Sequence, residues 1–237
     1  KSIKYKKGLS CFNKEEYEKA LKYFGSSHRS SPSYPFACAN AALAYQVKGD
    51  FDNAAKFARW ALRSMDTVSP KDPPLYIQAL RVHANALSIG TPAIALEHYQ
   101  QTVTCADDLI EQEDWCSSDV KFQKAHVLNE WGATLIKLER FDSAVEILQS
   151  ARELYEELKE YVTVGLTETL TNLGIALHTL GEETRAGAAL QSAKGYAESR
   201  DNSRQVWTIK VTAAQQNAHW IDRDRLDVIL DAAENAQ

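Results

Sequence analysis

The chain has 237 residues, of which 44% are hydrophobic and 25% are charged, so it can bury a sizeable core as one elongated domain or two compact ones. Its formal net charge is −5, which excludes a general electrostatic attraction to nucleic acid or to anionic lipid. No apolar run approaches the roughly 18 residues of a membrane-spanning helix, and no secretory signal is visible.

The four cysteines include no C-x-x-C pair, and Cys11 and Cys38 fall within helical apolar patterns. Cysteine in such a pattern usually acts as a small buried hydrophobic residue. We therefore expect reduced thiols and a cytoplasmic protein, with a Cys105–Cys116 disulfide as the alternative.

The distribution of proline indicates an all-α fold. All six prolines lie in the first 92 residues, so the rest of the chain contains none of the residues that break a helix. Strands would show period-two alternation between turn residues, and no segment shows it convincingly.

Five segments, taken in chain order, each predict two helices joined by a tight turn. In each segment a residue of the first helix, small in all but one case, is followed 12 and 19 residues later by two further residues of the second helix. These trios are Gly8/Ala20/Ser27, Ala42/Ala54/Ala61, His83/Ala95/Thr102, Gly132/Ala144/Ala151 and Gly174/Ala186/Ala193. Two helices that cross closely cannot both carry a bulky side chain at the crossing, which explains the small residues.

The repeat pattern predicts one solenoid domain over residues 1–237. Its repeats span about residues 1–34, 35–70, 75–112, 119–160 and 165–200. Residues 203–237 contain a weaker copy, Ala214/Leu226/Ala233, which predicts a degenerate repeat or capping helices with a polar outer face.

These residues resemble the motif of the tetratricopeptide repeat family, over essentially the whole chain. The motif has an aromatic residue or Leu, a Gly or Ala, a turn, then A-x-x-x-[FYL]-x-x-A and often Pro. The first repeat matches through Gly8, Tyr17, Ala20, Phe24 and Pro32, and the fifth through Leu173, Gly174, Gly181, Ala186, Leu190 and Ala193. The resemblance implies a right-handed superhelical solenoid of about five to six antiparallel helix–turn–helix repeats.

Two features depart from the family pattern. Successive first members of the trios lie 34, 41, 49 and 42 residues apart, whereas 34 is usual, so the chain is similar to a long-repeat variety of about 40 residues. His83 replaces a small residue, so the third repeat should be looser or carry a local hydrogen bond. We interpret His83 as a packed histidine rather than a ligand-contacting one.

The resemblance also implies that the first helices line a concave groove. Inner positions lie two or three residues before the small residue of each repeat, and one or four after it. The candidate groove residues at these positions are Tyr5, Phe12, Asn40, Arg81, Asn129, Asn172 and His178. An Asn amide can hold the backbone of an extended peptide, and an Arg guanidinium can bind a carboxylate. The alternatives are ordinary solvation and, for Asn, hydrogen bonding between adjacent hairpins.

Some tetratricopeptide proteins hold the C-terminal carboxylate of heat-shock chaperones in a five-residue clamp. Asn40 and Arg81 match two of the clamp positions, but the other three hold Tyr5, Ile77 and Leu9. Two of five residues do not make a clamp, so chaperone-tail binding is not expected.

Catalytic and metal-binding motifs are absent from the sequence. The six histidines show no H-x-x-x-H or H-E-x-x-H spacing. Neither G-x-S-x-G nor a phosphate-binding glycine loop nor a dinucleotide fingerprint occurs. We therefore expect no enzymatic activity, no metal site and no cofactor.

Three functions remain. The first is a scaffold or adaptor that binds a peptide or a partner helix in its groove. The second is the sensor or oligomerisation segment of a larger regulatory protein, for example a bacterial one, and the third and least favoured is nucleic-acid binding through the basic first repeat and Trp207 or Trp220. The expected partner is a protein or peptide rather than a membrane, and homo-oligomerisation stays open.

Overall fold

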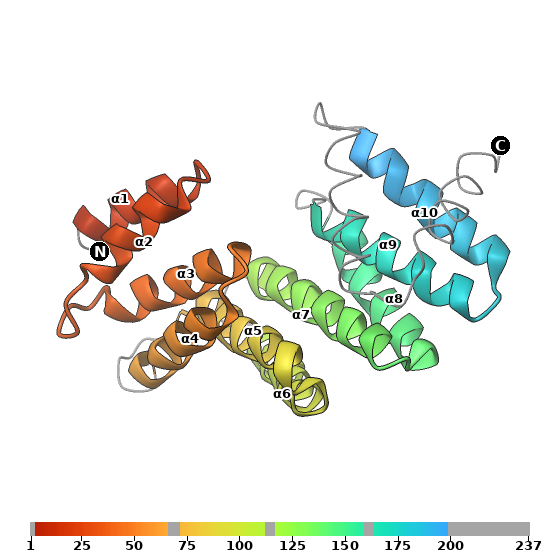
Figure 1. Cartoon of the computed structure of the whole chain (residues 1–237), viewed down its shortest axis with the longest axis horizontal. Coiled ribbons are helices and arrows are strands. Elements are labelled where there is room, and N and C mark those ends of the chain that lie inside the picture. The colour runs from red at the N-terminus through yellow and green to blue at the C-terminus, as the bar shows by residue number, and fades with distance from the viewer. Residues whose placement is uncertain (1–2, 66–71, 112–116, 159–163, 199–237) are drawn as a thin grey trace. The chain divides into compact units, whose positions relative to one another are not determined.

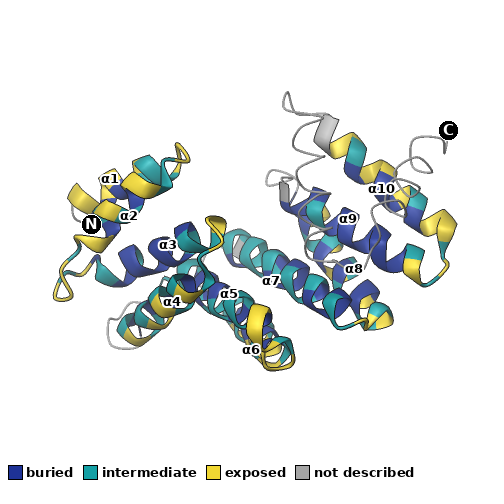
Figure 2. Ribbon diagram, in the orientation of Figure 1, coloured by how far each residue is buried: buried dark blue, intermediate teal, exposed yellow. Residues whose placement is uncertain are grey.

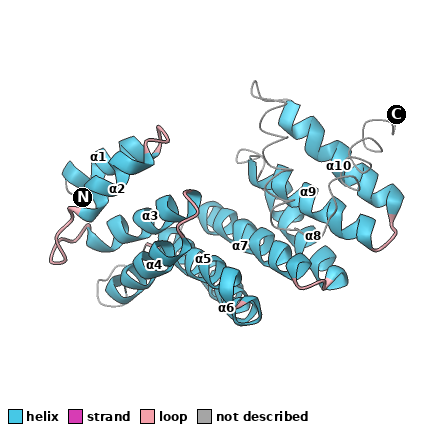
Figure 3. Ribbon diagram, viewed as in Figure 1, coloured by secondary structure: helices cyan, strands magenta, loops and turns pink. Residues whose placement is uncertain are grey.

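The computed structural model describes residues 3–65, 72–111, 117–158 and 164–198. Over these ranges the chain forms ten α-helices and no strand, which confirms the predicted all-α fold (Figure 3). None of the described helices combines the length and the apolar character that crossing a membrane requires. The predicted terminal repeat at 203–237 lies outside the described residues, as does Cys116.

The helices follow one another as hairpins (Figure 1). They are α1 (Ile3–Phe12) with α2 (Tyr17–Gly25), α3 (Tyr34–Val47) with α4 (Phe51–Met65), α5 (Pro73–Gly90) with α6 (Pro92–Glu111), α7 (Ser117–Lys137) with α8 (Phe141–Glu157), and α9 (Val164–Thr179) with α10 (Glu183–Glu198). The first member of each pair is called here the first helix of its hairpin.

The chain divides into two compact units, Lys1–Gln123 and Lys124–Gln237, called unit 1 and unit 2. In unit 1, α2 packs on α3, α4 packs on α5, and both α1 and α5 contact α3. In unit 2, α9 packs on both α8 and α10. Side chains of α3 and α9 are buried along most of the helix length, so the first helices form much of the core (Figure 2).

Glycine lies where the two helices cross in three of the hairpins. A Cβ atom added to Gly8, Gly132 or Gly174 would stand within 3.0 Å of a side chain of the second helix. The side chains concerned are Phe24, Leu148 and Leu190, respectively. Each large residue therefore occupies the space that the glycine leaves open, which confirms that small residues permit the close crossing.

In all three hairpins the large residue follows the glycine by 16 positions. The second hairpin has Ala42 and Ala58 at the corresponding positions, both fully buried. The third has His83 and Tyr99, of which Tyr99 is fully buried. Three different combinations of residues thus occur at these two positions in one chain: glycine with a large residue, two alanines, and histidine with tyrosine.

The hairpin turns share one backbone geometry in four of the five cases. The residue seven positions after the crossing residue has a positive φ: 61° at Glu15, 76° at Gly49, 57° at Glu139 and 79° at Gly181. Its N–H bonds the carbonyl three residues earlier, and the next N–H bonds the carbonyl five residues earlier, as in Gly181 to His178 (2.9 Å) and Glu182 to Leu177 (2.9 Å). This is the Schellman arrangement that ends a helix with a left-handed residue.

The third hairpin lacks this turn. Gly90, at the equivalent position, stays within α5, and Thr91 alone connects α5 to α6. The N–H of Thr91 bonds the Leu87 carbonyl at 2.8 Å, and its hydroxyl donates to the same carbonyl at 3.2 Å. The departure at His83 is therefore accompanied by a different helix ending.

Cys11 and Cys38 carry free thiols, as the sequence predicts. Cys38 is buried in α3, where it packs as a small hydrophobic residue. Burial raises the pKa of its thiol to about 11, so the thiol stays protonated.

Candidate functional site

The predicted groove residues Tyr5 and Asn40 meet inside unit 1. The Asn40 amide Nδ2 donates to the Tyr5 hydroxyl at 3.3 Å, which joins α3 to α1. The same Nδ2 donates to the Phe36 carbonyl at 2.9 Å, so both of its hydrogens are used. Burial raises the pKa of Tyr5 to about 12, with a further contribution from the negative charge of Asp72, so the phenol stays neutral.

A second predicted pair, Asn129 and Asn172, meets inside unit 2. Nδ2 of Asn172 donates to Oδ1 of Asn129 at 3.1 Å, which joins α9 to α7. The two pairs use the same register, because the acceptor residue lies three positions before the crossing glycine of its hairpin. The donor residue lies two positions before the crossing residue of the next hairpin. We call these two bonds the first-helix ladder.

The three Asn side chains are buried, yet each retains bonding capacity. Asn40, Asn129 and Asn172 are 8%, 5% and 9% exposed. Among the described residues, no hydrogen bond is made by Oδ1 of Asn40, Nδ2 of Asn129 or Oδ1 of Asn172. None of these three amide atoms is fully buried, so each is open to solvent and available to a ligand that can bond it.

Arg81 lies on α5 and is 6% exposed. It occupies the same position relative to the crossing residue as Asn40 and Asn172. One turn earlier on α5, Nε2 of Gln78 donates to the Ala39 carbonyl at 3.4 Å and joins α5 to α3. Sequence reasoning missed Gln78, because it considered only four positions of each first helix and Gln78 is at none of them.

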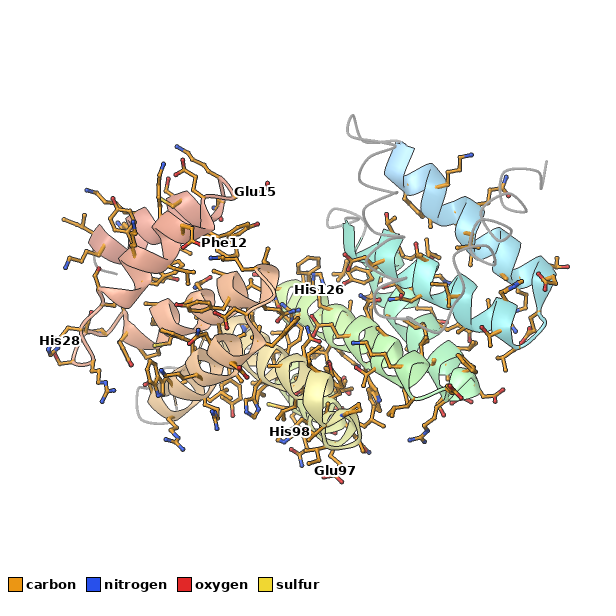
Figure 4. All side chains as sticks on the ribbon, viewed as in Figure 1. Phe12, Glu15, His28, Glu97, His98 and His126 are labelled. Carbon is orange, nitrogen blue, oxygen red and sulfur yellow. The ribbon has the colours of Figure 1, made fainter. Side chains whose placement is uncertain are left out.

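Phe12 and His178 do not take part in the ladder. Phe12, near the end of α1, is half-buried and meets the ring of Tyr17 edge-on at 5.4 Å (Figure 4). Nδ1 of His178 lies 2.9 Å from Oε2 of Glu183, across the turn between α9 and α10. Both residues thus contact the second helix of their own hairpin, and their role in a groove stays a prediction.

Unit 2 has a surface cavity that sequence reasoning also missed. Its volume is about 230 Å³, and it lies between α8, α9 and α10. Leu170, Leu173 and Leu177 of α9 form its apolar floor, and Arg152 and Arg185 lie on its walls. The spacing of the three leucines places them on one face of a helix, which is the sequence signal for this floor. The cavity adjoins the second helices rather than the ladder.

In the described ranges, no cluster of three or more His, Cys, Asp or Glu side chains could hold a metal ion. The expectation that the protein is not an enzyme stays a prediction.

Solved structures with low sequence identity share this fold. The apo form of the quorum sensor NprR from B. thuringiensis matches with a TM-score of 0.68 and 15% identity, over 98% of this chain and 65% of NprR. NprR in complex with its cognate peptide NprX gives a TM-score of 0.66 at the same identity and coverage. BtubC from P. vanneervenii gives 0.59 at 18% identity, over 99% of this chain and 91% of BtubC.

Sequence comparison, in contrast, matches only a short part of the chain. An uncharacterized protein of Methanocaldococcus jannaschii is 42% identical over 50 residues, which are 21% of this chain and 58% of that protein. The chain therefore spans less than two thirds of the length of this relative and of NprR. No family model matches the chain. From its successive hairpins and its structural likeness, the chain has a helical-repeat solenoid fold of the tetratricopeptide type.

Proposed function

We propose that the chain is a protein-interaction scaffold that binds an extended peptide or a partner helix. The proposed binding surface is the side of the first helices that carries the ladder residues, called here the first-helix face. The observation that carries this proposal is the ladder, in which buried Asn side chains retain amide atoms without a hydrogen bond among the described residues. These amide atoms are open to solvent, so a ligand can form hydrogen bonds with them in place of water.

In unit 2 the remaining atoms complement a peptide group. Nδ2 of Asn129 can donate to a main-chain carbonyl, and Oδ1 of Asn172 can accept from a main-chain N–H. Every peptide backbone presents these two groups, so the pair fixes the path of a bound chain without reading its sequence. In unit 1, taken by itself, Asn40 has only an acceptor left, which favours an N–H of a ligand bound to that unit.

The structural likeness to NprR supports the same proposal, because NprR forms a complex with its cognate peptide NprX. That likeness also favours a second candidate, in which the chain is the peptide-sensing segment of a larger regulator. This chain matches 65% of the NprR chain, so an effector segment outside the matched part is compatible with the comparison. A parent gene that encodes only the repeats would remove the second candidate and leave the first.

The test compares peptide affinity between the wild type and the variant Asn129→Ala/Asn172→Ala. Binders are selected from a random peptide library with the wild-type protein, and Kd is measured by isothermal titration calorimetry. The variant should bind about tenfold or more weakly, because each lost hydrogen bond contributes about 1 kcal/mol.

Asn13→Ala is the matched control, because Asn13 is an exposed asparagine in the α1–α2 turn. It should bind with wild-type affinity. Thermal melting of all three proteins establishes that each is folded at the titration temperature. Equal Kd values for the wild type and the folded double variant would contradict the proposal.

A further inference from the structure

His83 occupies a helix crossing where the other hairpins have glycine or alanine. Its ring meets the ring of His98 edge-on, with centroids 5.4 Å apart and an interplanar angle of 86°. His83 belongs to α5 and His98 to α6, so the contact holds the two helices of the third hairpin together (Figure 4 labels His98 on α6). His83 is half-buried, and a charge on its ring would be poorly hydrated.

Two neighbouring groups oppose a positive charge on His83. Desolvation lowers the pKa of His83, and both His98 and Arg59 of α4 lower it further. The third helix that packs on α5 is α3, and it contains no acidic or basic side chain between Tyr34 and Val47. Glu97, next to His98 on α6, is exposed to solvent. Among the described residues, no carboxylate contributes to the pKa of His83, including Asp52 of α4 and Asp107 and Asp108 of α6.

We propose that the α5–α6 hairpin is an acid-sensitive joint of unit 1, which loosens when protonated His83 faces His98 and Arg59. The folded-state pKa of His83 lies below its ordinary value of 6.5. The stability that the neutral His83 ring gives to the folded state is therefore fully present above pH 6.5. It is lost as the pH falls through the folded-state pKa of His83. A half-buried charge without a counterion separates the helices that enclose it.

The joint has a consequence for the rest of unit 1. Gln78 and Arg81 lie on the same helix as His83, and Gln78 bonds α5 to α3. A movement of α5 therefore changes the first-helix face of unit 1, whatever that face binds. Acid should thus weaken unit 1 at the α5–α6 hairpin.

The test is hydrogen exchange of the full chain at pH 7.5 and pH 5.5, without ligand, with protection factors corrected for intrinsic exchange rates. In the wild type, protection of α5 and α6 should fall by at least about threefold relative to α9 and α10. His83→Gln keeps a polar side chain of similar size that does not titrate, so its protection ratio should not change with pH.

His98→Gln retains His83 but removes one of the two neighbours that lower the pKa of His83, so the acid-induced loss should be smaller than in the wild type. His28→Gln, in the loop between α2 and α3, is the control histidine and should behave as the wild type (Figure 4). The proposal is overturned if the wild type shows no selective loss, or if His83→Gln and His98→Gln both lose protection as the wild type does. Because the measurement uses no peptide, its outcome is independent of the proposed binding function.

Discussion

The third and fifth hairpins solve the same packing problem with opposite choices. In α9–α10 the first helix has Gly174 and the second has Leu190, whereas α5–α6 has His83 and Tyr99. The turn of the fifth hairpin has a left-handed Gly181, and the third hairpin keeps the equivalent Gly90 in its helix. The comparison teaches that the same repeat accommodates a glycine with a large residue in one hairpin and two large residues at the equivalent positions of another.

The strongest way to break this comparison is to mismatch the crossing in the fifth hairpin. Leu190→Ala should cost about 2–5 kcal/mol of unfolding free energy, because it leaves a cavity over Gly174. Gly174→Ala should cost about 1–3 kcal/mol, because its Cβ would stand within 3.0 Å of Leu190. The double variant recreates the Ala42/Ala58 pair of the second hairpin, so its cost should be smaller than the sum.

Urea unfolding followed by circular dichroism measures all three free energies. Additivity of the two single costs would show that the sizes at the two positions are not coupled.

A second way to sharpen the comparison uses the same Gly→Ala substitution in the two turns. The change in stability should have opposite signs in the two hairpins. Gly181→Ala should destabilise the protein by about 1 kcal/mol, because φ is 79° at this position and Ala avoids the left-handed region. Gly90→Ala should stabilise it by up to about 1 kcal/mol, because Gly90 is helical and no atom lies near its added Cβ. Thermal melting gives both signs directly, and the same sign for both variants would refute the difference between the turns.

The smallest expected effect concerns Glu139, a left-handed residue that is not glycine. Glu139→Gly should stabilise the protein by about 0.5–1 kcal/mol, because glycine adopts a positive φ without the strain of a Cβ. The gain is measured as a rise in the urea midpoint. Glu182→Gly is the control. Glu182 directly follows the left-handed Gly181 in the turn of the fifth hairpin, so this substitution should not stabilise the protein.

The helical hairpins and their crossings are predictable from sequence, because Gly8, Gly132 and Gly174 recur at a fixed offset from residues of the second helix. The ladder is predictable only in part. Counting positions from the crossing residue selects Tyr5, Asn40, Asn129 and Asn172, but does not show that they bond one another across hairpins. That information depends on which first helices are neighbours, and an offset within one hairpin does not contain it.

Other features escape sequence reasoning for physical reasons. Glu15 and Glu139 stand at the same turn position as Gly49 and Gly181, but Glu is not a residue that favours a positive φ. The ring contact between His83 and His98 joins residues 15 positions apart on two helices. Tertiary packing overrides local preference in both cases.

The repeated register of the ladder bears on how such a protein can change its length. In both bonds the acceptor lies in one hairpin and the donor in the next, so a pair of consecutive hairpins is the smallest unit that carries a complete bond. Gene duplication can therefore add or remove such a pair without new side chains evolving for the bond inside it.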